Sequence, residues 1–477
     1  MKKLATYIRY AVLMLVVLCS ASCNDFLNDI PKGQKTPEEW ADFNAFIKNN
    51  SFPYFEMDQL FCLVGDLYKT PNSLNSNELL RVHYFWNEDT DRTLINSVDK
   101  NAYYSAYEAM FYWNLIIEYT PSATNCTQQQ KDMLIAQAKV LRAMTYFYVA
   151  NYYAAPYSQK NKDLLAVPLV TSSSVEAASP QVSLETIYQF MLNDLENAID
   201  ALPKVGESIL HPTKSAGYGM LARVYLHMGN YEKALKNASL ALEENDQLYD
   251  WIQFYYNDEE RFTNPDEYSS SCKEDPEKKN VENYVFHFSS MSFWSGLNGL
   301  SYAISPERAA KFEEGDTRLL THWKAKESSK SGKYFAGIYG LEPNKGGIRT
   351  PEMYYIKAEC LARLGGEANI QAAMELVNKV RKTRILPEFY QDWTASSTEE
   401  AVRKIIADKA NEYIQSQVIF CDYRRLNTDP TFATTLTKEV DDKKYQLNPG
   451  SHLWIMPFPI EVINNPGNGT IQQNVTK

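Results

Sequence analysis

ARVYLHMGNYEKALKNASLAL, residues 222–242, reads as two helices joined by a tight turn. Its alanines, including Ala222, Ala234 and Ala238, are small enough to let two antiparallel helices approach closely, and tyrosines fill the gaps between them. Gly229, followed by an asparagine, is a helix-ending signal. This order is typical of tetratricopeptide repeats, so the stretch predicts a helical-repeat fold.

Apolar residues at helical spacing extend this pattern along the chain. Residues 130–153 carry one apolar stripe and are expected to pair with a helix over residues 101–120. Ser183 is a good N-cap for a helix that continues to Leu202. Residues 354–381 repeat the helix, turn, helix order with two glycines at the turn. The predicted fold class is therefore mostly α, with tetratricopeptide-like helical repeats.

Two long inserts interrupt the helix pairs, about residues 52–100 and 244–345. A regular solenoid has no such inserts, because each repeat follows the last directly. Both inserts hold many aromatic residues among Ser, Asn, Asp and Gly. We expect one helical body over residues 51–477, in which the irregular inserts form a second, ligand-binding face.

The first residues read as an export signal. Lys2, Lys3 and Arg9 give a basic start, and the apolar run that follows, residues 10–18, is too short to span a bilayer as a helix. Small residues then lead directly to Cys23, the position at which a lipoprotein signal places its lipidated cysteine. An ordinary signal peptide with an incidental cysteine is the alternative, because a serine stands where such signals usually carry a large apolar residue.

This interpretation divides the N-terminal region into a lipoprotein signal peptide, residues 1–22, and a lipidated tether that leads into the fold, residues 23–50. Acyl chains on Cys23 would hold the mature protein on a membrane without another apolar segment. Loss of the signal would change the formal net charge from −11 to −14. Such acidity argues against nucleic acid as a partner, because nucleic-acid binding needs clustered Lys and Arg.

Several segments together resemble the SusD/RagB family of nutrient-binding outer-membrane lipoproteins. Their order and spacing carry the resemblance more than any one of them. One segment departs from the family pattern: residues 405–426 lack the usual Glu-Arg pair, Glu-Gly turn and Trp before Asp-Leu. The matching segments are Cys23 to Leu27, Pro31 to Gly33, Gln137 to Ala143, Tyr146 to Tyr148, Ala155 to Tyr157, Arg349 to Glu359, Leu453 to Pro459, Glu461, Asn464 to Pro466, and Gln473-Asn474.

The resemblance implies a lipid-anchored protein on the outer face of the outer membrane. Its relatives work as capture subunits over a SusC-like TonB-dependent transporter, and most of them bind glycans while some bind peptides. We therefore expect a glycan ligand and such a transporter as partners, with a peptide ligand as the alternative. A purely structural repeat scaffold is disfavoured by the lipid signal and the aromatic inserts.

Glycan binding needs aromatic faces for the C–H sides of sugar rings and polar groups for their hydroxyls. Two insert segments provide this mixture, and we expect Trp86 and Trp294 as stacking platforms. Core packing of the same aromatics is the alternative. The candidate residues are Tyr84, Trp86, Asn87 and Asp89 in the first segment, and Trp294, Asn298 and Tyr302 in the second.

Catalytic and metal-binding motifs are missing from the sequence. The six histidines are scattered, with no H-E-x-x-H, and there is no G-x-S-x-G elbow or phosphate-binding loop. Adjacent carboxylates such as Glu259-Glu260 seldom face each other across a cleft, as a glycosidase requires. We therefore expect no enzyme activity, no metal and no cofactor.

Overall fold

The computed structural model describes residues 37–48, 58–95, 99–174, 176–264, 280–287, 299–328, 332–338, 344, 346–464, 471–475 and 477. Three predicted residues, Cys23, Trp294 and Asn298, lie outside this part of the chain. Of the helices within it, none is both long and apolar enough to cross a membrane.

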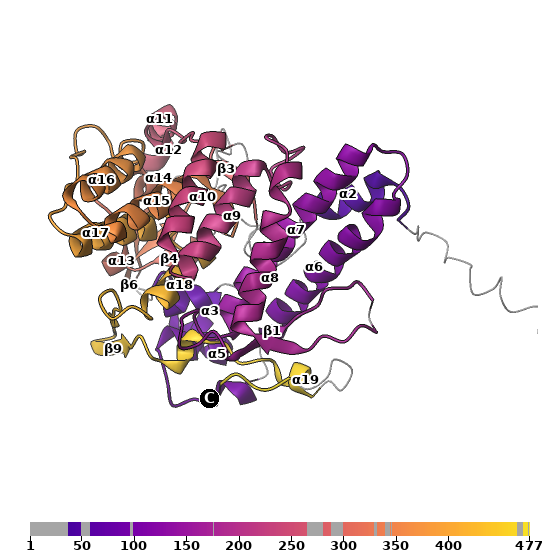
Figure 1. Cartoon of the computed structure of the whole chain (residues 1–477). Helices are drawn as coiled ribbons and strands as arrows, with labels where there is room; N and C mark the ends of the chain where they lie inside the picture. The colour runs from indigo at the N-terminus through magenta and orange to yellow at the C-terminus, as the bar shows by residue number, and fades with distance from the viewer. Residues whose placement is uncertain are drawn as a thin grey trace, which may run out of the picture.

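A layer of antiparallel helices runs across the molecule (Figure 1). Each helix packs on the next in the order α6, α7, α8, α9, α10, α15, and α15 then packs on both α16 and α17. The fold class is thus confirmed as mostly helical. These helices are α6 (Asp99–Tyr119), α7 (Gln128–Tyr153), α8 (Leu184–Glu196), α9 (Lys214–His227), α10 (Tyr231–Glu244), α15 (Thr350–Leu364), α16 (Glu367–Arg381) and α17 (Thr398–Glu412).

Local sequence signals explain where these helices begin and end. Thr127 and Gln130 form a reciprocal capping box at the start of α7, and the Ser183 side chain accepts a backbone N–H of α8. Gly229 has a φ of +72°, so it makes the turn between α9 and α10 without a Cβ clash. The helix predicted to reach Leu202 ends at Glu196, because a short 3₁₀ turn follows and Pro203 cannot continue a helix.

The alanines of the opening stretch lie where the prediction places them. Ala222, Ala234 and Ala238 are completely buried in the main hydrophobic cluster, and α9 packs along α10. In the α15–α16 pair Ala358 and Ala373 are also completely buried, whereas Ala372, which the pattern indicated, is half-buried. Small side chains at the contact therefore set the close helix spacing in both pairs.

The inserts contain more regular structure than the sequence predicted. Their helices have four to seven residues, which is too short for a periodic apolar stripe to be recognised. An antiparallel three-stranded sheet in the order β4-β6-β5 completes the second insert. The elements are α3 (Asp58–Leu63), α4 (Pro71–Ser76) and α5 (Glu78–Tyr84), then α11 (Trp251–Asn257), α12 (Glu259–Thr263), β4 (Gly299–Ile304), α13 (Pro306–Ala309), α14 (Thr317–His322), β5 (Trp323–Ser328) and β6 (Gly332–Gly337).

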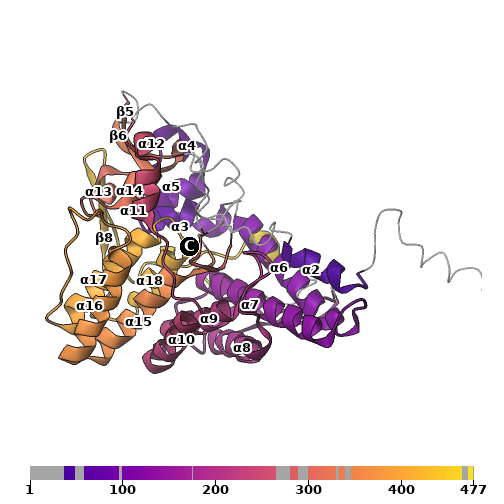
Figure 2. The same cartoon turned by 90° about the horizontal axis from the view of Figure 1, so that it is seen from above.

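The two inserts gather on one side of the molecule. Figure 2 shows α4, α5, α12 and the β5–β6 hairpin together on the side opposite α8, α9, α10 and α15. We call the side formed by α3 to α5 and by α11 to β6 the insert face. The remaining elements are α2 (Trp40–Lys48), β1 (Leu165–Pro168), β2 (Gln181–Ser183), β3 (Asn283–Val285), β7 (Ile348–Arg349), α18 (Gln417–Leu426), β8 (Leu436–Val440), β9 (Lys443–Leu447) and α19 (Ile460–Ile463).

A buried arginine joins three helices of the layer. Arg223 of α9 makes a bidentate pair with Glu352 of α15, at 2.8 and 2.6 Å. Its third nitrogen donates to Tyr148 Oη of α7 at 2.8 Å, and a further bond reaches the carbonyl of Gly347 at 2.7 Å. Both charged side chains are almost completely enclosed. Four of the five N–H groups of this guanidinium therefore donate to Glu352, Tyr148 or Gly347.

Substitution of Glu352 by Ala should strongly destabilise the protein, since it leaves Arg223 charged and uncompensated in the core. Breaking a buried pair in this way costs about 3–5 kcal/mol of unfolding free energy. Urea unfolding measures the loss. Glu399→Ala, which breaks the exposed Glu399–Arg403 pair, is the control and should leave the unfolding midpoint unchanged. Equal midpoints for the two variants would contradict the prediction.

Candidate functional site

Trp86, predicted as a stacking platform, lies directly after α5. Its φ of 50° is a left-handed conformation that glycine usually adopts after a helix, and the N–H of Asn87 donates to the carbonyl of Val82 at 3.0 Å. The indole is only 6% exposed and belongs to the main hydrophobic cluster. In this arrangement the ring presents little surface to a ligand, and its role as a platform stays a prediction.

A lysine from the C-terminal hairpin β8–β9 occupies the space beside Trp86. Lys438 Nζ lies 4.3 Å from the ring centroids of both Tyr84 and Trp86, a cation–π arrangement. The same ammonium group donates to the backbone carbonyl of Tyr84. Burial lowers the pKa of Lys438 to about 8. The lysine and the core together enclose Tyr84, which is 5% exposed.

Tyr302, from the second predicted segment, lies close to residues 66–68 of the first insert. Its ring is buried in a small aromatic cluster of the insert face. Gln415 Nε2 donates both to the carbonyl of Tyr302 at 3.0 Å and to the carbonyl of Asp66 at 3.1 Å. The N–H of Tyr68 donates to the carbonyl of Ala303 at 2.8 Å. The structure therefore joins the two inserts along the segment that precedes α4.

The polar members of the first predicted group are exposed. Asn87 and Asp89 form one turn, in which Asn87 Oδ1 accepts the N–H of Asp89 at 3.0 Å. Both side chains lie on the insert face and can be reached from solvent. Trp294 and Asn298 belong to the residues that the structure does not describe, so their roles stay predictions.

A stacked tyrosine pair on the insert face was missed by the sequence analysis. Tyr68, before α4, and Tyr334, on β6, lie with ring centroids 5.5 Å apart and planes at 6°. Both rings are half-buried. Such a pair offers apolar ring surface next to solvent, as sugar stacking requires. The residues are 266 positions apart in the sequence, so only the folded chain reveals the pair.

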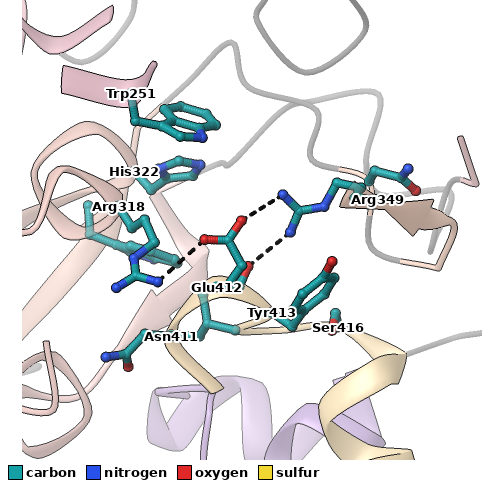
Figure 3. Close-up of a pocket in the computed structure, with 11 residues that line it drawn as sticks. Trp251, Arg318, His322, Arg349, Asn411, Glu412, Tyr413 and Ser416 are labelled. Atoms are coloured by element: carbon teal, nitrogen blue, oxygen red, sulfur yellow. Dashed lines mark hydrogen bonds and ion pairs between the residues drawn. The ribbon is translucent and has the colours of Figure 1, made fainter. Parts of the chain in front are cut away.

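A small, partly open cavity lined by polar and aromatic side chains lies beneath the insert face (Figure 3). Its volume is about 40 Å³, which suits roughly three water molecules and is far below the ~300 Å³ of a small-molecule site. Among the described residues, Trp251 Nε1, Tyr413 Oη and Ser416 Oγ are buried without a hydrogen-bond partner. The lining residues are Trp251, Arg318, His322, Trp323, Asn344, Arg349, Asn411, Glu412, Tyr413, Ile414 and Ser416.

Glu412, the last residue of α17, anchors a charge cluster at this cavity. It accepts from Arg349 at 2.8 Å, from Arg384 at 3.0 Å and from Arg318 at 3.3 Å, and Figure 3 shows its carboxylate between Arg318 and Arg349. Burial alone would raise the pKa of Glu412, but the three guanidinium groups outweigh burial and hold this pKa well below its usual range. Burial does raise the pKa of the neighbouring Glu282.

Glu412 itself lies in the segment that departs from the family pattern. Residues 405–426 supply Glu412, Gln415 and Ser416 to the cavity and its surroundings. Their signal in the sequence is a run of polar residues at the end of a helix, which also fits a solvated surface. In the sequence, Arg349 stands out only as the first residue of the matching segment Arg349 to Glu359. Nothing in the local sequence indicates that these groups are buried together.

A metal site does not form within the described residues. No group of three or more His, Cys, Asp or Glu side chains there has an arrangement that could hold a metal ion. The carboxylates of the cluster, Glu282 and Glu412, are instead bonded to arginines. The arrangement is that of a buried charge network.

Substitution of Glu412 by Gln should destabilise the protein by about 3–5 kcal/mol at pH 7, because it leaves buried arginines without a counter-charge. The pKa of Glu412 is lower in the folded than in the unfolded state. Its charge therefore contributes fully above about pH 4.3, the unfolded value, and progressively less as the pH falls below it.

Urea unfolding at pH 7, 5 and 3.5 measures this dependence. The difference between the wild type and Glu412→Gln should be the same at pH 7 and 5 and smaller at pH 3.5. The exposed Glu260→Gln is the matched control and should track the wild type. A difference that stays constant down to pH 3.5 would show that the carboxylate charge is not what stabilises the cluster.

Two family models match the chain. One, described as starch-binding and associating with the outer membrane, matches residues 25–226, and the other, the SusD family, matches residues 222–476. A relative from Formosa agariphila, SusD-like protein P2, is 26% identical over 258 residues. That match covers 51% of this chain and 47% of the relative, so the chain spans about half the length of this curated relative.

Solved structures share the fold over nearly the whole chain. A SusD superfamily protein from Bacteroides vulgatus has a TM-score of 0.68 at 16% identity, covering 92% of this chain and 99% of that one. A SusD-like carbohydrate binding protein from the same organism has a TM-score of 0.66 at 17% identity, covering 92% and 100%. Because the SusD model alone matches more than half of the residues, this chain belongs to the SusD family.

Proposed function

We propose that this chain is a cell-surface lipoprotein that captures oligosaccharide or polysaccharide and delivers it to a SusC-like TonB-dependent transporter without cutting it. The observation that carries the proposal is the stacked pair Tyr68–Tyr334 on the insert face, in a protein of the SusD family. A structural neighbour from Bacteroides vulgatus is itself described as a carbohydrate binding protein.

The chemistry of the insert face supports a neutral, ring-shaped ligand. The tyrosine pair supplies apolar ring surface, while the exposed Asn87 and Asp89 supply an amide and a carboxylate for hydroxyl groups. Trp294 and Asn298 remain the proposed contacts from the second segment. Peptide capture, the competing function, relies chiefly on backbone hydrogen bonds to a free strand edge or groove, which stacked tyrosines do not provide.

The pairing of buried carboxylates with arginines supports capture of the ligand without cleavage. A glycosidase needs two carboxyl groups across an open cleft, one of them able to donate a proton. Glu282 and Glu412 are enclosed and share the guanidinium of Arg384. Glu313, which belongs to an adjacent acidic pair, is bonded to Arg381 at 2.8 Å. These groups are therefore engaged in holding the fold.

Lipid anchoring is tested by substitution of Cys23 with Ala in the native host. The variant should move from the membrane fraction to the soluble fraction and should no longer incorporate labelled palmitate, since the acyl chains supply the membrane affinity. Cys19→Ala, in the preceding signal, is the matched control and should keep both properties. Unchanged membrane association of the Cys23 variant would overturn the lipid-anchor proposal.

Glycan capture is tested with the soluble chain that begins after Cys23. Native affinity electrophoresis in gels that contain amylopectin, xylan, laminarin, glucomannan or polygalacturonan should show retardation by at least one polymer. Tyr334→Ala should raise the dissociation constant for that polymer about fivefold, the value of one aromatic contact of about 1 kcal/mol. Trp294→Ala should weaken binding by a similar factor.

Matched controls separate binding from folding. Tyr231→Ala removes a half-buried tyrosine at the start of α10, away from the insert face, and should leave retardation unchanged. The released reducing ends are measured in the same mixtures and should stay at background. If no polymer retards the chain in gels and no glycan on an array binds it, glycan capture is overturned. Release of reducing ends would overturn the non-catalytic role.

A further inference from the structure

A second groove, whose lining includes no residue of the insert face, has the features of a ligand site. It lies along α16 and has a volume of about 920 Å³, and a smaller groove of about 490 Å³ along α17 continues it. Trp393 lines both, in the loop that joins the two helices. Figures 1 and 2 show α16 and α17 at one end of the molecule, opposite α2 and α6. The larger volume is within the range of small-molecule sites.

Trp393 is held in place by its surroundings. Its backbone N–H donates to Asn378 Oδ1 at 2.9 Å, and its carbonyl accepts from Asn378 Nδ2 at 2.8 Å. The guanidinium of Arg381 lies 4.0 Å from the ring centroid, and Arg381 is itself completely buried and paired with Glu313. A half-buried tryptophan so constrained loses little freedom when it binds a ligand.

The ring offers both kinds of contact that a sugar needs. Arg381 occupies one face, so the exposed part of the half-buried indole faces the grooves. The hydrogen bonds that hold Trp393 to Asn378 use its backbone N–H and carbonyl and do not involve the indole N–H. The buried Ile370 and Met374 of α16 also line the groove. An apolar surface for C–H groups therefore adjoins a donor available to a hydroxyl.

The rim of the groove is polar and nearly balanced in charge. Lys382 and Asp392 lie on it 3.5 Å apart and are both well exposed. Gln371 donates to Glu375 at 2.9 Å along α16. The lining carries three acidic and two basic side chains, so its formal net charge is only −1 and offers little attraction to a strongly charged ligand; these residues are Glu367, Glu375, Asp392, Lys379 and Lys382. The rim therefore fits a neutral ligand with many hydroxyl groups.

A peptide fits the same groove less well. Strand addition needs a free backbone edge, and both backbone polar groups of Trp393 are already bonded to Asn378. An amphipathic helix needs a continuous apolar strip, whereas the exposed wall of α16 carries Gln371, Glu375 and Lys379. The groove is therefore better suited to a ligand that is recognised by ring stacking and hydroxyl contacts than to a peptide.

We infer that the groove at Trp393 is a second glycan site, which holds another segment of the same neutral polysaccharide that the insert face binds. The inference rests on the proposed glycan-binding function, since it assumes the same ligand. Two separated sites on one chain would favour long polymers over short oligosaccharides, because the second contact becomes intramolecular.

The test uses the soluble chain in native gels that contain amylopectin, xylan, laminarin or glucomannan. Trp393→Ala should raise the dissociation constant for the retarding polymer about fivefold or more. Gln371→Arg, which places a longer side chain into the groove from an exposed position, should have the same effect without altering the core. Trp40→Ala is the control, since Trp40 is a half-buried tryptophan at the opposite end of the molecule.

The outcomes separate this inference from the proposed function. Weaker retardation of both groove variants, with wild-type retardation of Trp40→Ala, supports the second site. Wild-type retardation of Gln371→Arg and of a folded Trp393→Ala overturns it and leaves capture at the insert face intact. If Trp393→Ala fails to fold, the retardation of Gln371→Arg alone decides whether the groove binds the polymer. In another outcome, the groove variants lose a membrane protein that co-purifies with the wild type while polymer retardation stays at the wild-type level. That result would identify the groove as a protein interface and would overturn the inference.

Discussion

Arg223 is the point at which the helical layer is joined. Its guanidinium contacts α7 through Tyr148, α15 through Glu352, and the bend before β7 through the carbonyl of Gly347. Arg223 and Glu352, on either side of the second insert, are 129 positions apart in the sequence. A buried charge is tolerated only when it is paired and hydrogen-bonded. The fold must therefore bring all three partners to Arg223 at once, and this requirement specifies how the two halves of the layer meet.

The features that could be predicted from the sequence are those with short-range causes. Caps such as Thr127 and Ser183 and the turn at Gly229 act within a few residues, so the helices of the layer and their pairing follow from local patterns. The burial of Trp86 depends instead on Lys438, which lies 352 positions later in the chain. No local pattern reports such a contact, and a tryptophan among polar residues reads equally as a surface platform.

The charge cluster at Glu412 illustrates the same limit. Arg318 comes from α14 in the second insert, Arg349 from the start of α15, and Arg384 from the end of the α16 helix pair. Each arginine alone is compatible with an exposed position. Only their common partner at the end of α17 reveals that they lie in the interior. The segment that differs from the family pattern thus takes part in attaching the insert face to the helices.

This attachment also bears on how a ligand would be held. The insert face is joined to the layer by enclosed, multiply bonded groups, including Gln415 between Asp66 and Tyr302, and Trp393 is fixed at the far end by Asn378 and Arg381. Aromatic groups on rigid supports lose little entropy on binding, so modest stacking energies translate into affinity. Because the helical layer fixes the separation of the two regions, a flexible polymer and not the protein would have to adapt its path between them.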